Sequence, residues 1–303
     1  MSYGSGLSAT SGFTRQGDVR HPLIPALALL LSLSACAGAP PPEVAPPESP
    51  AGSPAVPIAT PAAAAPAGPT VVDRVEVPAA IRAVVDAADR SEADRALDAG
   101  RKPAETLAFF GIAPGMKVAE LGAGGGYTAE LLARAVGPTG AVYGQNTKFI
   151  LERFAEKPWS ERLAKPVMKN VVRVDREFGD PLPAEAHDLD AVFMVLFYHD
   201  TIWMDIDRAA MNKAIWKALR PGGVFAILDH SGRAGTGVTE VKTLHRIEEK
   251  VVREEVERAG FRLVAEASFL RNPGDTRDWN AAPTVAAERR GTSDRFVLKF
   301  VKP

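Results

Sequence analysis

The sequence Glu120-Leu121-Gly122-Ala123-Gly124-Gly125-Gly126 decides the fold, because an apolar run leads into it and a helical pattern leaves it. The run from Met116 to Ala119 is typical of a short β-strand, and it ends in the acidic Glu120. The glycines remove Cβ atoms where the backbone must turn sharply and approach a ligand, and the next helix offers free N–H groups. The stretch therefore predicts a strand, a ligand-binding turn and a helix in that order.

The spacing of the glycines separates two classes of cofactor. A dinucleotide site needs Gly-x-Gly-x-x-Gly, but Tyr127 stands at the position of the third glycine and Gly126 comes one residue early. This spacing argues against NAD or FAD. The stretch resembles instead the first motif of class I S-adenosylmethionine (SAM) dependent methyltransferases. The resemblance implies that the loop backs the methionine part of SAM and that the Glu120 carboxylate reaches its ammonium group.

The chain after the glycine loop alternates between helix and strand patterns. The predicted helices are Tyr127 to Val136, Asp205 to Leu219, and Thr239 to Ala259. Gly137-Pro138 ends the first of them. The predicted strands are Ala141 to Gln145, Val171 to Val174, Asp190 to Phe197, Val224 to Leu228, Phe261 to Phe269 and Arg295 to Val301. The run from Asp190 to Phe197 is continuously apolar, as expected of a strand that is buried on both faces.

A second motif supports the same resemblance. Leu219-Arg220-Pro221-Gly222-Gly223-Val224 is similar to the leucine-x-proline-glycine-glycine turn that these methyltransferases often carry before the fifth strand. Residues 111–303 are therefore expected to form a single α/β, Rossmann-like methyltransferase domain. Its sheet is expected to have seven mostly parallel strands, with helices on both faces and a last antiparallel strand.

The first 36 residues predict export and lipidation. Arg15 and Arg20 precede a short apolar run that begins at Leu23, which is typical of a secretory signal and too short to span a bilayer. Leu33-Ser34-Ala35-Cys36 resembles the bacterial lipoprotein signal, in which the cysteine is acylated. Cys36 is the only cysteine among 303 residues, so it is the expected lipidation site. No aspartate follows it, and the resemblance then implies the outer membrane, facing the periplasm.

Residues 37–70 are expected to be a disordered tether. Eleven of the thirty residues from Pro40 to Pro69 are proline and nine are alanine, so the segment cannot build a core. The remaining chain is long enough for one domain. The whole chain has a formal net charge of −1, and its acids and bases are interleaved, which gives no basic field for nucleic acid.

Residues 71–110 are expected to form a helical cover beside the cofactor pocket. One or two helices are predicted between Ile81 and Phe110, with Pro103 starting the second and Gly111 ending it. The polar residues there are Asp94, Arg95, Asp98 and Arg101. They are either solvent-exposed charge pairs or part of the cover's contact with the pocket.

Polar side chains gather where the predicted strands end. Tyr198-His199-Asp200 follows the fourth strand, Asp229-His230-Ser231 follows the fifth, and His245 lies further on. Because ligands bind at the carboxyl ends of parallel strands, these residues are expected on one rim. His199 is the candidate base, with Tyr198, Asp200 and His230 on the acceptor side. A divalent metal held by Asp200, Asp229 and imidazoles, or a purely structural role, is the alternative; no metal ligand is assigned.

One position departs from the family pattern. Class I methyltransferases usually place an acidic residue at the end of the second strand, where it accepts both ribose hydroxyls, but this chain has Asn146. An amide oxygen can accept a hydrogen bond, but it lacks the negative charge that strengthens a bond to a carboxylate. The resemblance then implies cofactor contacts from Glu120, Gly122, Ala123, Gly124, Gly126, Asn146 and, near the adenine, Asp175.

Together these features predict methyl transfer from SAM to an oxygen or nitrogen atom of a small molecule or envelope component. The alternative is a non-catalytic ligand-binding lipoprotein that reuses the fold. The rim histidines favour the enzyme, whereas Asn146 and the exported location favour the binder.

Overall fold

The computed structural model describes residues 68–303. The predicted signal, the lipidation site Cys36 and nearly all of the tether lie outside these residues. Within the part described, no helix is both long enough and apolar enough to cross a membrane.

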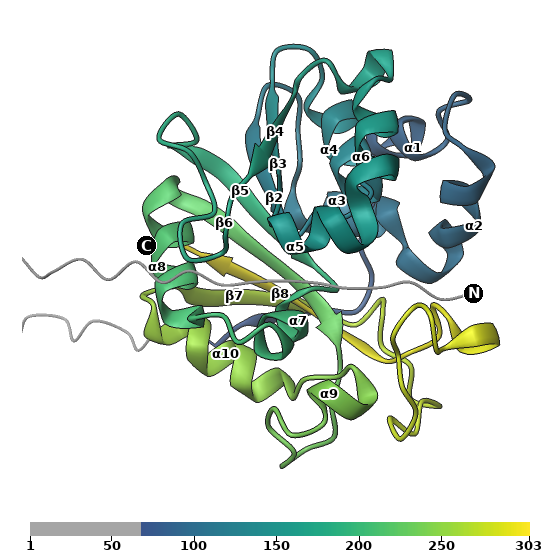
Figure 1. Ribbon diagram of the computed structural model, residues 1–303, viewed down its shortest axis with the longest axis vertical. Coiled ribbons are helices and arrows are strands. Elements are labelled where there is room, and N and C mark those ends of the chain that lie inside the picture. The colour runs from purple at the N-terminus through teal and green to yellow at the C-terminus, as the bar shows by residue number, and fades with distance from the viewer. Residues whose placement is uncertain (1–67) are drawn as a thin grey trace, which may run out of the picture. The chain divides into compact units, whose positions relative to one another are not determined.

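A single sheet of eight strands forms the centre of the domain (Figure 1). The strands are β1 Thr70–Val72, β2 Lys117–Leu121, β3 Ala141–Asn146, β4 Val171–Asp175, β5 Leu189–Val195, β6 Leu219–His230, β7 Arg262–Ala267 and β8 Arg295–Val301. Their order across the sheet is β1-β7-β8-β6-β5-β2-β3-β4. Every neighbouring pair is parallel except those of β8, which runs antiparallel to both β6 and β7. The predicted Rossmann-like methyltransferase fold is confirmed.

The expected number of seven strands is wrong. The additional strand, β1, pairs in parallel with β7 through Thr70, Val71 and Val72. It directly follows the proline-rich segment and is only three residues long, so its own pattern is too short to indicate a strand.

Helices cover both faces of the sheet (Figure 1). They are α1 Ala79–Val85, α2 Glu92–Arg101, α3 Pro103–Phe110, α4 Tyr127–Val136, α5 Lys148–Ile150, α6 Glu156–Leu163, α7 Tyr198–Trp203, α8 Arg208–Ala218, α9 Val241–Leu244 and α10 Glu249–Arg258, with short π and 3₁₀ turns at Leu151–Ala155, Pro166–Met168 and Ala287–Arg289. α1, α3, α4 and α6 lie on one side, and α8 and α10 lie on the other (Figure 1). The central strand β5 is buried on both faces, as its apolar run predicts, and Val192, Phe193 and Met194 are 0% exposed.

The N-terminal cover contains three helices where one or two were expected. α2 has its own start, because the Ser91 side chain accepts a hydrogen bond from the Asp94 N–H. Lys102, at φ 44°, separates α2 from α3. Pro103 begins α3 and Gly111 ends it in a left-handed conformation, as predicted.

The predicted helix from Thr239 to Ala259 is interrupted, and the interruption shapes the site. α9 ends at Leu244, His245 adopts the left-handed φ of 57°, and α10 begins only at Glu249. Between them Ile247 pairs with Ser231, just beyond β6. This pairing brings His245 to the carboxyl end of the sheet.

The other end of the site is shaped by α7, which was not expected. β5 stops at Val195 instead of Phe197, because Leu196 turns the chain with a φ of 54°. Tyr198, His199 and Asp200 then form the first turn of α7.

Candidate functional site at the carboxyl edge of the sheet

The glycine loop follows β2 with three residues in the left-handed region. Gly122, Gly124 and Gly126 have φ values of 69°, 55° and 81°. A Cβ on Gly122 would lie 2.7 Å from the Phe197 ring, and one on Gly126 would lie 2.4 Å from the Trp159 ring. At Gly124 no atom lies within 4 Å of that point. Gly122 and Gly126 therefore permit close packing within the protein, whereas Gly124 leaves open space.

Two amide side chains from the end of β3 hold this loop in place. The Gly122 N–H donates to Gln145 Oε1 at 3.0 Å, and the Gly124 N–H donates to Asn146 Oδ1 at 2.8 Å. Asn146 Nδ2 donates in return to the Gly124 carbonyl at 3.1 Å. Asn146 is fully buried, and both ends of its amide are engaged. The side chain therefore shapes the loop, because its oxygen accepts the loop's own N–H group, and its predicted contact with a ribose stays a prediction.

A cavity of about 350 Å³ opens beside the loop. Glu120, the segment from Gly122 to Gly125, Tyr127 and Thr128 line one side of it. Asp94, Leu97 and Arg101 of α2 line another, together with Pro158 and Arg162 of α6. Asp200, His230, His245 and Pro283 line the far end. The cavity thus joins the glycine loop, the N-terminal cover and the rim.

Glu120 is an unusual group for such a wall. It is 3% exposed, and burial raises the pKa of its carboxyl to about 8, although the Thr128 hydroxyl and the charge of Arg101 oppose this shift. Its Oε2 atom has no hydrogen-bond partner among residues 68–303. A buried acceptor without a donor is costly, so this carboxyl is suited to a cationic ligand.

The cover is tied to the loop by buried ion pairs, not by solvent-exposed ones. Arg162 binds the Asp94 carboxylate through two bonds of 2.7 and 2.9 Å and donates to the Gly125 carbonyl at 2.6 Å. The Tyr127 hydroxyl donates to Asp98 at 2.6 Å, and Arg101 lies over the Tyr127 ring at 4.4 Å. α2 therefore packs directly over the glycine loop.

The rim is organised around Asp229, which is 0% exposed. Its Oδ1 lies 2.6 Å from His199 Nδ1 and also accepts the His230 N–H at 2.7 Å, while its Oδ2 accepts the His199 N–H at 2.8 Å. Both oxygens are used, which fixes the tautomer and orientation of the His199 ring. Asp229 therefore positions the His199 ring, and it is not among the donor atoms that converge within 4.8 Å of one another on the other side of this ring.

Three side chains meet on the other side of this ring. His199 Nε2 lies 3.4 Å from Asp200 Oδ1, and His245 Nε2 lies 3.6 Å from the same oxygen. The His199 and His245 rings have centroids 4.1 Å apart, and the His230 ring lies 5.6 Å from His199. The three histidines predicted to share one rim are close neighbours.

The imidazoles have different electrostatic surroundings. Burial lowers the pKa of His199, but the charges of Asp229 and Asp200 outweigh it and raise the pKa to about 8. Burial lowers the pKa of His245 to about 4, and it lowers that of His230 well below the usual value. His199 is 0% exposed and lies behind Asp200 and His245. Its predicted role as the base that contacts substrate stays a prediction.

Two predicted site residues lie elsewhere. The expectation that Tyr198 lines the cavity is wrong: its buried hydroxyl donates to Glu255 at 2.9 Å and accepts from Asn212 at 2.9 Å, both beyond the opposite side of α7. Asp175 is half exposed, binds Arg173 and borders a separate hollow near α6. Gln145 and Arg162 were not predicted, because only the tertiary structure brings them to the loop.

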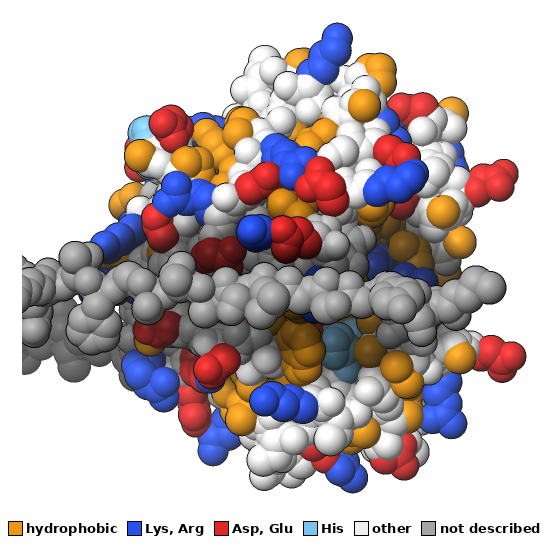
Figure 2. Space-filling model, viewed as in Figure 1, with side chains coloured by type: hydrophobic (Ala, Val, Ile, Leu, Met, Phe, Trp, Pro, Cys, Tyr) orange, Lys and Arg blue, Asp and Glu red, His pale blue; other side chains and the backbone are white. Residues whose placement is uncertain are grey.

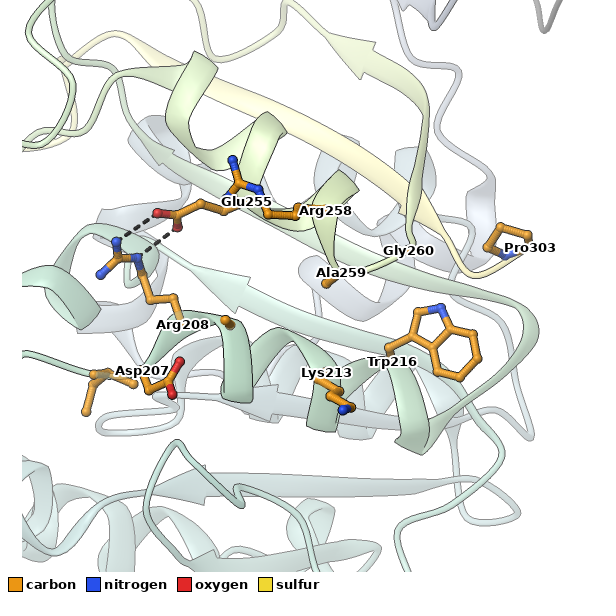
Figure 3. Close-up of a pocket in the computed structure, with 11 residues that line it drawn as sticks. Asp207, Arg208, Lys213, Trp216, Glu255, Arg258, Ala259, Gly260 and Pro303 are labelled. Carbon is orange, nitrogen blue, oxygen red and sulfur yellow. Dashed lines mark hydrogen bonds and ion pairs between the residues drawn. The ribbon is translucent and has the colours of Figure 1, made fainter.

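A larger cavity of about 840 Å³ lies between α8 and α10 (Figure 3). Arg208 and Glu255 form an ion pair at one end of it, and Trp216 and Pro303 lie at the other (Figure 3). None of its lining residues belongs to the glycine loop or the rim.

On the face shown in Figure 2, acidic and basic side chains are intermingled.

The strand order assigns the fold more firmly than any single motif. Five parallel strands centred on β2, with the antiparallel β8 inserted between β6 and β7, carry a Gly-x-Gly-x-Gly turn at the carboxyl end of β2. The chain has the class I methyltransferase fold. A family model for protein-L-isoaspartate(D-aspartate) O-methyltransferase matches residues 72–175, which extend from the end of β1 to the end of β4 and include the glycine loop.

Solved structures of methyltransferases are similar to the chain at low sequence identity. A SAM-dependent methyltransferase from Aquifex aeolicus is 20% identical, with 74% of this chain and 98% of that chain covered and a TM-score of 0.48. A putative sarcosine dimethylglycine methyltransferase from Galdieria sulphuraria is 17% identical, with 76% and 93% covered and a TM-score of 0.49. Fibrillarin from Aeropyrum pernix, crystallised with SAM, is 15% identical, with 63% and 68% covered and a TM-score of 0.41.

Proposed function

We propose that this protein is a SAM-dependent methyltransferase that acts on an oxygen or nitrogen atom of a small molecule or an envelope component. One observation carries the proposal. The buried Oε2 of Glu120, without a partner among residues 68–303, lines a cavity next to the open side of Gly124. The ammonium group of SAM would supply the missing donor, and Gly124 would leave room for the methionine chain.

The other residues of the cavity fit the same ligand. Glu120 and Gly122–Gly125 would hold the methionine part, while Asp94 and Arg101 of the cover would shield it from water. SAM, when bound, supplies an electrophilic methyl group. Asp200, His230 and His245 border the end of the cavity that remains for an acceptor. The chain's own contribution is to orient the acceptor there and to receive its proton at the rim.

We also propose that the domain is held at the bacterial cell envelope through a lipid on Cys36. Cys36 lies outside the described residues, so the support is its lipoprotein-like sequence and the proline-rich tether that follows. Such a tether would hold the domain away from a membrane surface.

The test is calorimetric titration of the purified full-length protein with SAM and with S-adenosylhomocysteine. We expect one ligand per chain, with a dissociation constant in the micromolar range. No binding up to millimolar ligand would overturn the assignment. Transfer of a radiolabelled methyl group from SAM to envelope extracts then separates an enzyme from a ligand-binding protein, because a binder gives saturation without transfer.

A further inference from the structure

The rim contains a group of nitrogen and oxygen donors that the proposed SAM site does not use. His199, Asp200 and His245 each offer one atom, and the three atoms lie within 4.8 Å of one another. The closest approaches are 3.4 Å between His199 Nε2 and Asp200 Oδ1 and 3.6 Å between His245 Nε2 and the same oxygen. Two ligands that each lie about 2.0–2.1 Å from a tetrahedral ion are separated by about 3.3 Å. Two of the three donor spacings therefore match a shared cation, and the third, between the two imidazoles, is at most 4.8 Å.

The orientation of His199 is an independent observation. Its Nδ1 is bound to Asp229, and its Nε2 faces Asp200 and His245. Nε2 is buried and has no hydrogen-bond partner among residues 68–303. Metal-binding histidines usually donate their second ring N–H to a carboxylate, a backbone carbonyl or water, which fixes the tautomer and strengthens the ligand. A buried ring nitrogen that is oriented but unpartnered points to a ligand.

We propose that His199, Asp200 and His245 form a binding site for a divalent first-row transition-metal ion. Asp229 positions His199 from behind, and its own oxygens are already occupied. Two imidazoles and one carboxylate suit zinc, iron, cobalt or nickel better than magnesium or calcium, which prefer oxygen donors. His230 is not among the converging donors, which are those of His199, Asp200 and His245; its Nδ1 is bound to the Ser293 hydroxyl at 2.7 Å.

The proposed metal site lies at the wall of the cavity, where it would affect the methyl acceptor. Asp200 and His245 line the cavity, so an ion held by them would be reached from the space proposed for the methyl acceptor. An acceptor hydroxyl bound there would lose its proton more readily. Metal binding itself goes beyond the proposed methyl transfer and does not depend on it, since it is measured without SAM.

The experiment is a metal titration of the full-length protein after removal of bound ions with a chelator. Zn²⁺ is titrated in competition with a chromophoric chelator, and Co²⁺ is added separately to record its visible absorption. We expect one ion per chain and a Co²⁺ spectrum of nitrogen and oxygen ligation. His245→Gln and Asp200→Asn should each weaken Zn²⁺ binding at least about 100-fold, because each removes a direct ligand. Asp229→Asn should weaken it about 10- to 100-fold at unchanged stoichiometry.

His187→Gln is the matched control. His187 lies next to Asp188, as His199 lies next to Asp200, but its side chain is 66% exposed and far from the rim. This variant should bind Zn²⁺ like the wild type. His245 is partly exposed, so His245→Gln is expected to fold, and circular dichroism checks that it does. Absence of an ion at one per chain, or equal Zn²⁺ affinity of the His245→Gln and His187→Gln variants, would refute the site. If Cys36 held the ion instead, the His245→Gln and His187→Gln variants would bind Zn²⁺ with equal affinity.

Discussion

Ionisation of Glu120 should be coupled to binding of SAM. Burial holds the pKa of this carboxyl at about 8 in the free protein, so at pH 7 about nine-tenths of the molecules carry it protonated. The cationic ammonium of SAM favours the carboxylate. Binding at pH 7 should therefore release close to one proton per ligand. Between pH 5.5 and pH 7 the affinity should rise about 30-fold, because the ionised fraction of a group with this pKa rises by that factor.

The assay is calorimetric titration in two buffers of different ionisation enthalpy. The slope of the observed heat against that enthalpy gives the number of protons released. Glu120→Gln removes the ionisation and keeps the shape of the side chain, so it should bind SAM without this proton release. Other groups near the cavity, His245 among them, contribute equally to proton release in both proteins. The difference in proton release between the two proteins therefore belongs to Glu120. Equal proton release by the wild type and by Glu120→Gln would show that Glu120 is not the group that ionises when SAM binds.

The same pKa has a consequence for stability without ligand. A carboxyl whose pKa is raised in the folded state stabilises the fold fully below its unfolded value of about 4.5, and this contribution is lost as the pH rises to about 8. The shift corresponds to about 5 kcal/mol. Glu120→Gln should therefore unfold at a higher temperature than the wild type at pH 8, with the difference shrinking toward pH 5. A constant difference across this range would contradict the raised pKa.

Three further predictions concern the loop, α7 and the anchor. Gly124→Ala should bind SAM at least about tenfold more weakly, because its Cβ enters the space proposed for the ligand. Both Gly124→Ala and Gly126→Ala strain a left-handed φ, but Gly126→Ala should lower the unfolding temperature more, because its Cβ also collides with Trp159. Equal effects on folding would contradict the difference between the two positions. Tyr198→Phe should cost about 1–2 kcal/mol of unfolding free energy, measured with urea, and leave SAM affinity unchanged, since its hydroxyl binds away from the cavity. A loss of SAM affinity would return Tyr198 to the site. Cys36→Ser should release the protein from the membrane fraction, and a wild-type protein found in the soluble cytoplasmic fraction with residues 1–35 intact would contradict the anchor.

Much of the fold follows from local patterns. The helix from Tyr127 to Val136 and the strand from Arg295 to Val301 have their predicted bounds, because amphipathic or apolar runs end there at glycine or proline turns or at the end of the chain. The interruption at His245 has no such signal. It depends on the pairing of Ile247 with Ser231 and on the buried ion pair between Arg246 and Asp275, 29 residues further along the chain. Helical periodicity alone therefore predicted one continuous helix.

In the site, too, some features follow from the sequence pattern and others depend on tertiary contacts. The position of the glycine loop and the meeting of His199, His230 and His245 follow from strand ends that share one edge of the sheet. The direction of each side chain does not follow, because it depends on partners from other elements. The Asn146 side chain accepts a hydrogen bond from the Gly124 N–H, and the Tyr198 hydroxyl donates to Glu255 and does not face the cavity.

A crystal structure of the full-length protein with S-adenosylhomocysteine would show directly whether the cofactor binds at the glycine loop and Glu120. We expect the methionine part of the ligand along Gly122–Gly126, with its ammonium group within hydrogen-bond distance of Glu120 and its sulfur toward Asp200 and His245. A ligand bound in the cavity between α8 and α10, or one whose ammonium group lies away from Glu120, would contradict this expectation.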